Sequence, residues 1–378
     1  MDNPSILFVI DGIEFGGGER TFLQLIEQLP KDKYNIYTAT TTIGAFSEIL
    51  TKKNIDYFPL DMTKRFSWKT LNTLLRTIEE NNIDIVHSQG GRVDFYTRLV
   101  SRILKSKIKV VNTIAMPVEG YDASFLKKTI YCFIDRFFER YVDRFIVVSK
   151  SLQTTLENNH KIPGEKIALV YNGIELDEYR DEASEEFSLK LKKEFNIDKS
   201  VSLVGAIGRI VWQKGFEYLV EAVPVILKEC PEVRFMIIGD GPLKKELEEK
   251  SRRLKIEDKI IFTGFRTDIK EALASIDILV MPSLKEGFPM VTLEAMAMAK
   301  PIIAADIDGI REQIEHQKNG LLVSPEKPVI LAEAVISLLK NKEEAERLGM
   351  AAKERVEEEF SVKKMVSETE SVYKDLLI

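Results

Sequence analysis

The feature of this sequence that most restricts its fold is a regular alternation between short β-rich apolar runs and longer segments of helical period. This alternation is typical of parallel βαβ units, because a parallel pair of strands needs a crossover connection between them. In the first half, strands are expected at 6–10, 34–40, 56–60, 83–88, 108–114, 144–149 and 166–171. A second series is expected at 201–208, 233–239, 259–264, 277–282, 300–306 and 320–324. The sequence therefore predicts an α/β protein with two Rossmann-like, doubly wound sheets.

The two series of strands also predict two domains. A chain of 378 residues, 44% of them hydrophobic, is long enough for two separate cores. The acidic, weakly apolar stretch 172–199 interrupts the alternation, and we interpret it as the connection and hinge between the domains. Ligands of parallel α/β sheets bind beyond the carboxyl ends of the strands. We therefore expect a ligand cleft faced by both domains.

Composition argues against several classes of partner. The formal charge of −6 disfavours a general nucleic-acid binder, which needs a net basic face. The two cysteines, Cys132 and Cys230, are too few and too far apart for a disulfide framework or a thiolate metal site, which fits a reducing compartment. No apolar run approaches the roughly 20 residues of a spanning helix, and the first residues lack the pattern of a signal peptide. We expect a cytoplasmic protein, either soluble or peripheral to the inner face of a membrane.

A glycine-rich turn, Gly16 to Gly18 in "DGIEFGGGER", follows the first strand and opens an amphipathic helix. Such a turn lets the backbone approach a ligand closely, and the helix start offers unpaired N–H groups to an anion such as phosphate. The dinucleotide-binding fingerprint does not fit, because counting from Gly16 and Gly18 places its third glycine at Thr21. A phosphate site and a tight structural turn both remain open for these glycines.

Two basic residues, Arg209 and Lys214, lie in "GAIGRIVWQKG", where the first strand of the second series passes into its helix. Cations at the carboxyl end of a strand suit a diphosphate, which they neutralise and hydrogen-bond. The alternative interpretation is a solvated basic pair. The spacing alone does not decide between them.

The segment "KEGFPMVTLEAM" places two carboxylates, Glu286 and Glu294, on either side of a helix start. Pro289 suits the first position of this helix, which would carry Glu294 on its second turn and leave Glu286 in the preceding loop. The helix is apolar around most of its circumference, so it is expected to be buried, and a buried carboxylate needs a partner. Glu294 is thus a candidate for ligand binding or for a structural ion pair.

These motifs, together with "VYNGIEL", "IIGDGP", "TGF" and "KPIIAADIDGIREQI", resemble the group 1 glycosyltransferases, also called family 4. The resemblance runs from about residue 5 to about residue 360, and the seven residues between Glu286 and Glu294 match the family's E-x7-E motif. It implies the GT-B fold and a retaining, nucleotide-sugar-dependent enzyme of polysaccharide or glycoconjugate synthesis. It also implies that the last helix crosses back to the first domain.

The resemblance implies a role for each motif residue. Arg209 and Lys214 would neutralise the diphosphate, Glu286 would face the sugar hydroxyls, and Glu294 would hold the ribose. The residues implied to contact the donor nucleotide sugar are Gly16, Gly17, Gly18, Arg209, Lys214, Phe265, Arg266, Glu286, Gly287, Phe288, Pro289, Met290, Val291 and Glu294. With cations in the diphosphate role we expect no metal, and "DID" at 306–308 only imitates the metal-binding motif of another glycosyltransferase fold.

Two positions bear on catalysis. Relatives often carry a histidine where this chain has Ala115, which puts that histidine's role in doubt here. His87 matches the first histidine of a common H-x-H segment, so it joins Arg209, Lys214 and Glu286 as a catalytic candidate. A structural histidine at the end of a strand is the alternative interpretation of His87.

Two segments mix basic and aromatic residues, "KRFSWK" at 64–69 and the stretch 125–145. Such mixtures suit contact with a membrane surface or a lipid acceptor. In the second segment Phe133, Phe137, Phe138 and Tyr141 follow helical spacing, so a packed core helix is the competing interpretation.

The sequence therefore predicts a cytoplasmic, metal-independent, retaining glycosyltransferase with a lipid-linked or saccharide acceptor. We expect an acceptor-binding domain at 1–172 plus 362–378 and a nucleotide-sugar-binding domain at 173–361. A nucleotide-sugar epimerase of similar fold and a catalytically silent binding subunit are the alternatives.

Overall fold

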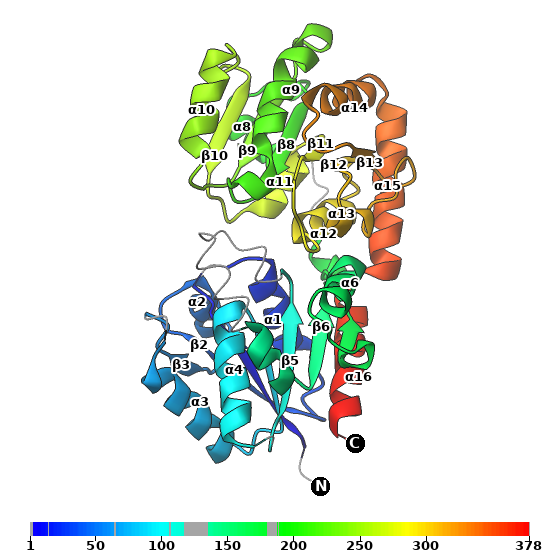
Figure 1. Cartoon of the computed structure of the whole chain (residues 1–378). Coiled ribbons are helices and arrows are strands. Elements are labelled where there is room, and N and C mark those ends of the chain that lie inside the picture. Colours follow the sequence, from blue (N-terminus) through cyan, green and yellow to red (C-terminus); the bar gives the residue numbers. More distant parts are fainter. Residues whose placement is uncertain are drawn as a thin grey trace. The chain divides into compact units, whose positions relative to one another are not determined.

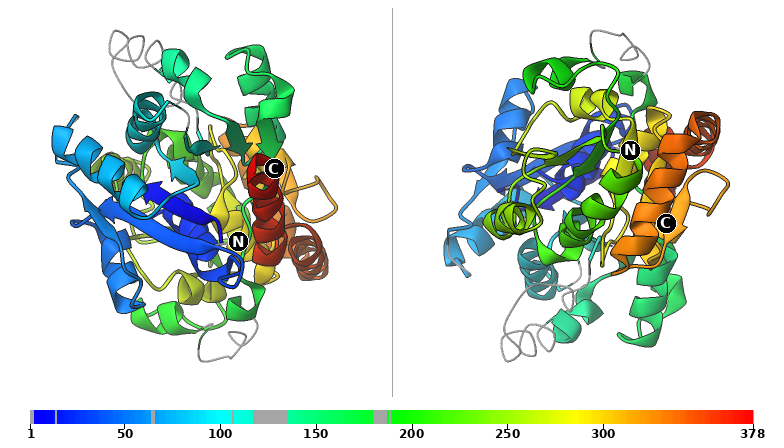
Figure 2. Two further views of the ribbon diagram at one scale, coloured as in Figure 1. Left: turned by 90° about the horizontal axis from the view of Figure 1, so that it is seen from below. Right: turned by 90° about the horizontal axis from the view of Figure 1, so that it is seen from above.

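The computed structural model describes residues 3–13, 15–63, 66–105, 107–116, 135–179, 187 and 189–377. Residues 117–134, which include Phe133, lie outside the described residues. The chain divides into two compact units (Figure 1). The N-terminal unit comprises Met1–Asn172 and Val362–Ile378, and the C-terminal unit comprises Gly173–Ser361. The views from below and above in Figure 2 show helices on both faces of each sheet.

The N-terminal unit is built on a seven-stranded parallel sheet with the order β3-β2-β1-β4-β5-β6-β7. All seven strands expected from the sequence are present. They are β1 (Ser5–Ile10), β2 (Asn35–Thr41), β3 (Phe58–Leu60), β4 (Ile85–Gln89), β5 (Lys109–Ile114), β6 (Arg144–Val147) and β7 (Ile167–Leu169).

The helices of this unit follow the strands as crossovers. They are α1 (Gly17–Gln28), α2 (Ala45–Lys52), α3 (Trp68–Glu80), α4 (Gly91–Ile103), the 3-10 turn η2 (Glu139–Tyr141), α6 (Lys150–Asn158) and the 3-10 turn η3 (Gly164–Lys166). Serine side chains cap two of them, because Ser67 accepts from the Thr70 N–H at α3 and Ser149 accepts from the Leu152 N–H at α6. Helix α4 lies in front of the sheet in Figure 1.

The last helix, α16 (Val362–Leu377), belongs to the N-terminal unit although it ends the chain. It packs against α1, and its residues Met365 and Tyr373 are buried in the same core as Phe8 and Phe22. The expected return of the last helix to the first sheet is confirmed. Its amphipathic pattern explains the docking, because an apolar stripe on a helix must be buried against another element.

The C-terminal unit has a six-stranded parallel sheet with the order β10-β9-β8-β11-β12-β13. Its strands are β8 (Leu203–Ile207), β9 (Arg234–Ile238), β10 (Ile260–Gly264), β11 (Ile278–Met281), β12 (Ile302–Ala305) and β13 (Leu321–Val323). The second expected series of strands is therefore complete, and with the first it confirms the prediction of two Rossmann-like sheets.

The helical segments of the C-terminal unit are η4 (Leu176–Tyr179), α8 (Lys190–Glu194), η5 (Trp212–Lys214), α9 (Phe216–Glu229), α10 (Lys244–Arg253), α11 (Ile269–Ser275), α12 (Met290–Ala297), α13 (Asp308–Arg311), α14 (Pro328–Lys340) and α15 (Lys342–Glu359). Helix α12 is buried almost completely, as its apolar composition predicts. Among the described residues, no helix combines the length and the apolar character that crossing a bilayer requires.

Both sheets share one topological property that positions functional residues. The first strand of each unit lies beside the fourth, so that β1 pairs with β4 and β8 pairs with β11. At such a switch point the two crossovers leave in opposite directions, and the loops beyond the paired strand ends stand next to each other. The glycine turn follows β1, the loop with Arg209 and Lys214 follows β8, and the E-x7-E motif follows β11.

Candidate functional site

In the C-terminal unit the switch point brings together the loops that follow β8 and β11. The backbone N–H groups of Leu284 and Lys285 both donate to the Gln213 carbonyl oxygen, at 2.7 and 3.3 Å. Gly215 makes this approach possible, since its φ is +58° and a Cβ there would lie 2.2 Å from the Pro282 carbonyl oxygen. A side chain at position 215 would push the two loops apart.

The two loops carry an ion pair between predicted site residues. Lys214 Nζ lies 2.6 Å from Glu286 Oε1, and the two side chains are 21% and 9% exposed. The Ser283 hydroxyl donates to the same carboxylate oxygen at 2.8 Å. An ammonium group and a carboxylate are thus held together, one suited to an anion and the other to hydroxyl groups.

Arg209, the second predicted cation, lies in the β8–α9 loop five residues before Lys214, and it is exposed. The neighbouring backbone is fixed, because the Ile210 N–H donates to the Asp240 carbonyl oxygen at 2.7 Å. The loop after β8 therefore carries both cations that are predicted to bind the diphosphate.

Helix α12 begins directly beyond Glu286. Pro289 is its N-cap residue with φ −69° and ψ 128°, one position before the helical start expected for it. The side chain of Gln313 is fully buried and donates through Nε2 to the Pro289 carbonyl oxygen at 3.0 Å. Gln313 thus fixes the end of α12 that carries unpaired N–H groups and the positive end of the helix dipole.

The short helix α13 packs directly against the loop that carries Glu286. At Gly309, in α13, a Cβ atom would lie 2.5 Å from the carbonyl oxygens of both Glu286 and Gly287. The backbone of the loop therefore contacts the α13 backbone at a position that has no side chain. Ser283, Gly309 and Gln313 were not identified from the sequence, because their roles depend on contacts with residues far along the chain.

Glu294 lies on the second turn of α12, as expected, and is 4% exposed. Phe288 is also buried, and its ring packs edge-on against Phe360 at 5.3 Å between centroids. The predicted donor residues between them, Gly287 and Pro289 to Val291, continue through the loop into the first turn of α12. The motif therefore forms one continuous stretch of backbone.

The predicted base-binding segment follows β10. Phe265 is 75% exposed, which is unusual for a large aromatic side chain. The guanidinium of Arg266 forms a paired hydrogen bond with Glu194 and contacts Asp268, and these carboxylates raise the pKa of Arg266 further above its ordinary range. Its side chain is therefore engaged within the protein, so only the backbone of Arg266 is available to a ligand.

In the imitation metal motif both carboxylates are paired with an arginine. Arg311 Nε lies 2.6 Å from Asp306 Oδ1, and its Nη1 lies 3.3 Å from Asp308 Oδ1. The hydrogen bond from Arg311 holds the pKa of Asp306 below its usual range. A guanidinium thus neutralises both carboxylates.

In the N-terminal unit the predicted glycine turn lies at the start of α1. Gly16 is the N-cap residue, and its N–H donates to the Glu19 carboxylate at 3.0 Å. A Cβ at Gly18 would lie 2.3 Å from the Gln89 side-chain nitrogen, so this glycine lies in close contact with the side chain at the end of β4. Gly16 and Gly17 are exposed. Gly18 thus packs toward the sheet, whereas Gly16 and Gly17 are accessible at the start of α1.

His87 is completely buried in the N-terminal unit. Its Nδ1 lies 2.5 Å from the Tyr373 hydroxyl of α16, and its Nε2 lies 2.7 Å from the Thr113 hydroxyl of β5. Burial lowers the pKa of His87 to about 3, so the ring is neutral at physiological pH. The structure favours a packing role for this histidine. The hydrogen-bond partners of its ring nitrogens are side-chain hydroxyls and not backbone groups. Ala115 lies just beyond the end of β5.

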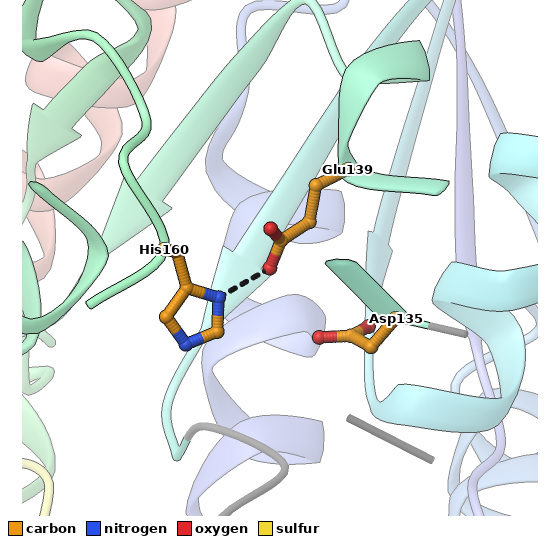
Figure 3. A group of neighbouring side chains, drawn as sticks. All are labelled: Asp135, Glu139 and His160. Atoms are coloured by element: carbon orange, nitrogen blue, oxygen red, sulfur yellow. Dashed lines mark hydrogen bonds and ion pairs between the residues drawn. The ribbon is translucent and has the colours of Figure 1, made fainter. Parts of the chain in front are cut away.

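A separate cluster in this unit comprises Asp135, Glu139 and His160 (Figure 3), whose ligand atoms all lie within 4.8 Å of one another. His160 Nδ1 lies 2.5 Å from Glu139 Oε1, and the fully buried Arg98 donates to Asp135 Oδ1 at 2.5 Å. A guanidinium at this distance supplies the positive charge that a metal ion would otherwise bring. We interpret the cluster as a buried polar network joining α4, η2 and the end of α6.

Comparison with known proteins gives two family matches. Residues 15–178 match the model described as Glycosyltransferase Family 4, and residues 187–355 match the model described as Glycosyl transferases group 1. An uncharacterized glycosyltransferase of Methanocaldococcus jannaschii, MJ1607, is 33% identical over 61% of this chain and 59% of its own length.

Two bacterial relatives align over most of the chain. N-acetyl-alpha-D-glucosaminyl L-malate synthase of Bacillus anthracis is 30% identical over 91% of this chain and 85% of the relative. UDP-Gal:alpha-D-GlcNAc-diphosphoundecaprenol alpha-1,3-galactosyltransferase of Escherichia coli is 22% identical over 96% and 94% of the two chains.

Among solved structures, Anabaena Alr3699/HepE in complex with UDP-glucose superposes with a TM-score of 0.85 at 22% identity. The superposition covers 97% of this chain and 99% of that one. This likeness confirms the GT-B fold expected from the motifs.

Proposed function

Because the chain belongs to the group 1 glycosyltransferases of family 4, we propose that it transfers a sugar from a nucleotide-diphosphate sugar, UDP- or GDP-linked, to a saccharide or lipid-linked acceptor. The transfer retains the configuration of the anomeric carbon and serves cell-envelope polysaccharide or glycoconjugate synthesis. The observation that carries this proposal is the Lys214–Glu286 pair beside the start of α12. It places an anion-binding and a hydroxyl-binding group at the switch point of one sheet.

The cations act on the leaving group. When the anomeric C–O bond breaks, its electron pair stays on the diphosphate, and Arg209, Lys214 and the first N–H groups of α12 stabilise the growing negative charge. No divalent metal takes part in this scheme.

The acceptor hydroxyl attacks the same face of the sugar from which the diphosphate departs. A new bond forms from the acceptor oxygen to the anomeric carbon, and the hydroxyl proton passes to the departing phosphate oxygen. No side chain serves as nucleophile in this front-face substitution. His87 takes no part, since it is buried and both ring nitrogens face other side chains.

The carboxylates hold the donor at two places. Glu286 accepts hydrogen bonds from the sugar hydroxyls, and Glu294 accepts them from the ribose. The backbone at Phe265 and Arg266 receives the base, and the exposed ring of Phe265 lies beside it. The acceptor binds to the N-terminal unit, and the protein works in the cytoplasm.

The proposal is tested by measuring nucleoside diphosphate release from a panel of UDP- and GDP-sugars, with and without acceptors. We expect release from one class of donor, stimulated by acceptor, and a loss of two or more orders of magnitude in Arg209→Ala and Lys214→Ala. Lys245→Ala, an exposed lysine of α10, is the matched control.

Three results of this panel contradict the proposal. Donor binding without release indicates a silent binding subunit, and isomerised donor without release indicates an epimerase. Near-native turnover in either cation variant refutes the leaving-group role. Circular dichroism of each variant distinguishes lost chemistry from lost fold.

A further inference from the structure

The first residue of α10, Lys244, lies beside the segment that we assign to the base of the donor. Helix α10 contacts β10, the strand that ends at Gly264 (Figure 1). Gly264 has a φ of +77°, and a Cβ atom built on it would lie 3.5 Å from Lys244 Nζ. The ammonium group is therefore next to the backbone that leads directly into Phe265 and Arg266.

The start of α10 is held by main-chain contacts on both of its sides. At the end of β9, the Gly239 N–H donates to the Gly264 carbonyl oxygen at 3.0 Å. Toward β8, a Cβ atom at Gly241 would lie 2.3 Å from the Ile210 carbonyl oxygen, and the Leu243 N–H donates to that oxygen at 3.3 Å. The fold therefore fixes the backbone from which the side chain of residue 244 extends.

The other cations of this region are engaged within the protein, whereas Lys244 is not. The guanidinium of Arg266 binds two carboxylates, and Lys270 Nζ lies 3.0 and 3.2 Å from the carbonyl and carboxylate oxygens of Glu178. Within the described part of the chain, Lys244 Nζ forms no hydrogen bond, and its ion pair with Glu248 Oε1 spans 4.0 Å. The side chain is 26% exposed, so its donors are available to a ligand.

Local helix energetics do not favour a cation at this position. The first turn of a helix carries the positive end of the helix dipole, which stabilises anions and not cations. A lysine four residues before a glutamate is also the weaker orientation of such a pair. Lys244 thus departs from local preference on both counts, which is typical of residues retained for function.

The chemistry of an ammonium group restricts which bases it can recognise. The group has three donors and no acceptor. Uracil and guanine present keto oxygens, O4 and O6, whereas cytosine and adenine carry amino donors at the corresponding positions. A donor placed against an amino group leaves both groups unpaired, which costs binding free energy. Lys244 therefore suits a base with a keto group at this position.

We propose that Lys244 selects the base of the donor by donating a hydrogen bond to its keto oxygen, O4 of uracil or O6 of guanine. The role rests on the proposed function, because it requires the base to lie beside Phe265 and Arg266. Lys244 is a specificity residue, since the ribose and the diphosphate separate the base from the reacting carbon. Lys244→Met should therefore raise the KM of the nucleotide sugar and leave kcat nearly unchanged.

The test is isothermal titration with two pairs of nucleoside diphosphates, UDP with CDP and IDP with ADP. Within each pair the bases differ by a keto or an amino group at the position in question. For the ring that the protein prefers, we expect the keto member to bind at least about tenfold more tightly. Lys244→Met should lower this preference by roughly five- to tenfold through weaker binding of the keto member. Lys244→Arg keeps a charged donor and should retain most of the preference.

Two control variants come from the same helix. Lys245→Met removes the same charge from the exposed neighbouring position and should leave the preference unchanged. Glu248→Gln removes the partner of the 4.0 Å ion pair and should also preserve the preference. A purely structural role of that pair would instead give Glu248→Gln the same loss as Lys244→Met. Circular dichroism establishes that each variant is folded.

The outcomes separate a failed base contact from a failed transferase. An unchanged preference in folded Lys244→Met, equal weakening of keto and amino diphosphates, or a wild-type protein that does not prefer the keto member would each overturn the role of Lys244. Each of these results leaves the transferase activity standing, because nucleoside diphosphate release from nucleotide sugars is measured in parallel. A wild-type protein that neither binds nor releases any of these diphosphates would overturn the proposed function, and the role of Lys244 with it.

Discussion

The Lys214–Glu286 ion pair leads to a quantitative prediction about donor binding. The Glu286 carboxylate neutralises the cation that we assign to the diphosphate, at 2.6 Å. A nucleoside diphosphate must therefore compete with Glu286 for Lys214. Replacing the carboxylate in Glu286→Gln removes this competition while keeping the size of the side chain and a hydrogen-bond acceptor for Ser283.

The magnitude follows from the geometry. A hydrogen bond between charged groups contributes about 1.5–3 kcal/mol net, and the 21% exposure of Lys214 places the pair toward the lower end. If diphosphate binding gives up most of that contact, Glu286→Gln should bind the nucleoside diphosphate about 1–2 kcal/mol more tightly, which is roughly 5- to 30-fold. Turnover of the nucleotide sugar should fall, since the sugar hydroxyls lose the Glu286 carboxylate that accepts their hydrogen bonds.

Isothermal titration of UDP and GDP against four proteins measures this effect: wild type, Glu286→Gln, Lys214→Ala and the double variant. Lys214→Ala should weaken binding, and the gain from Glu286→Gln should disappear in the Lys214→Ala background. Equal or weaker nucleotide binding by a folded Glu286→Gln protein would refute the competition. If Glu286→Gln still tightens nucleotide binding in the Lys214→Ala background, the gain in affinity does not come from breaking the Lys214–Glu286 pair.

Four further predictions test other parts of the structure. Glu294→Ala should weaken donor binding more than it lowers kcat, whereas a purely structural role would lower stability and leave the KM of the folded fraction unchanged. His87 in the folded protein has its pKa lowered from 6.5 to about 3, so its stabilising effect is complete above pH 6.5 and is lost as pH falls toward 3. Chemical denaturation from pH 7 to 4.5 should lose up to about 1.4 kcal/mol per pH unit through this group, and His87→Gln should remove that part of the slope. Gly215→Ala should lower the Tm and turnover together, because its Cβ would meet the Pro282 carbonyl, and normal values would disprove the close approach. Gln313→Leu should destabilise the protein by about 1–3 kcal/mol by leaving the Pro289 carbonyl without its buried donor, as denaturant titration would measure.

The sequence anticipated the fold closely because its signals are local. Each strand of a parallel sheet is buried on both faces and appears as a short apolar run, and each crossover helix has an apolar stripe. The thirteen expected strands are therefore all present, with ends that differ by at most two residues. The helix start near Pro289 differs by one position, since proline occupies the N-cap and not the first turn.

The candidate site was only partly visible in the sequence. Glycine, cation and E-x7-E motifs located the loops, since these residues are adjacent in the chain. The contacts within the site depend on pairing between β8 and β11, strands about 70 residues apart, so neither the Lys214–Glu286 pair nor its Ser283 donor could be inferred from spacing. His87 shows the opposite case, because a motif suggested catalysis while the return of α16 buried the ring against Tyr373.

By itself, the sequence determined the two parallel sheets, the family and the segments to which we assign its chemistry, because hydrophobic period and short motifs act over neighbouring residues. Only the tertiary structure decided which of those side chains meet. The switch points place loops from distant strands together, and burial sets the charge of His87. These outcomes depend on distance and burial, which are properties of the folded chain.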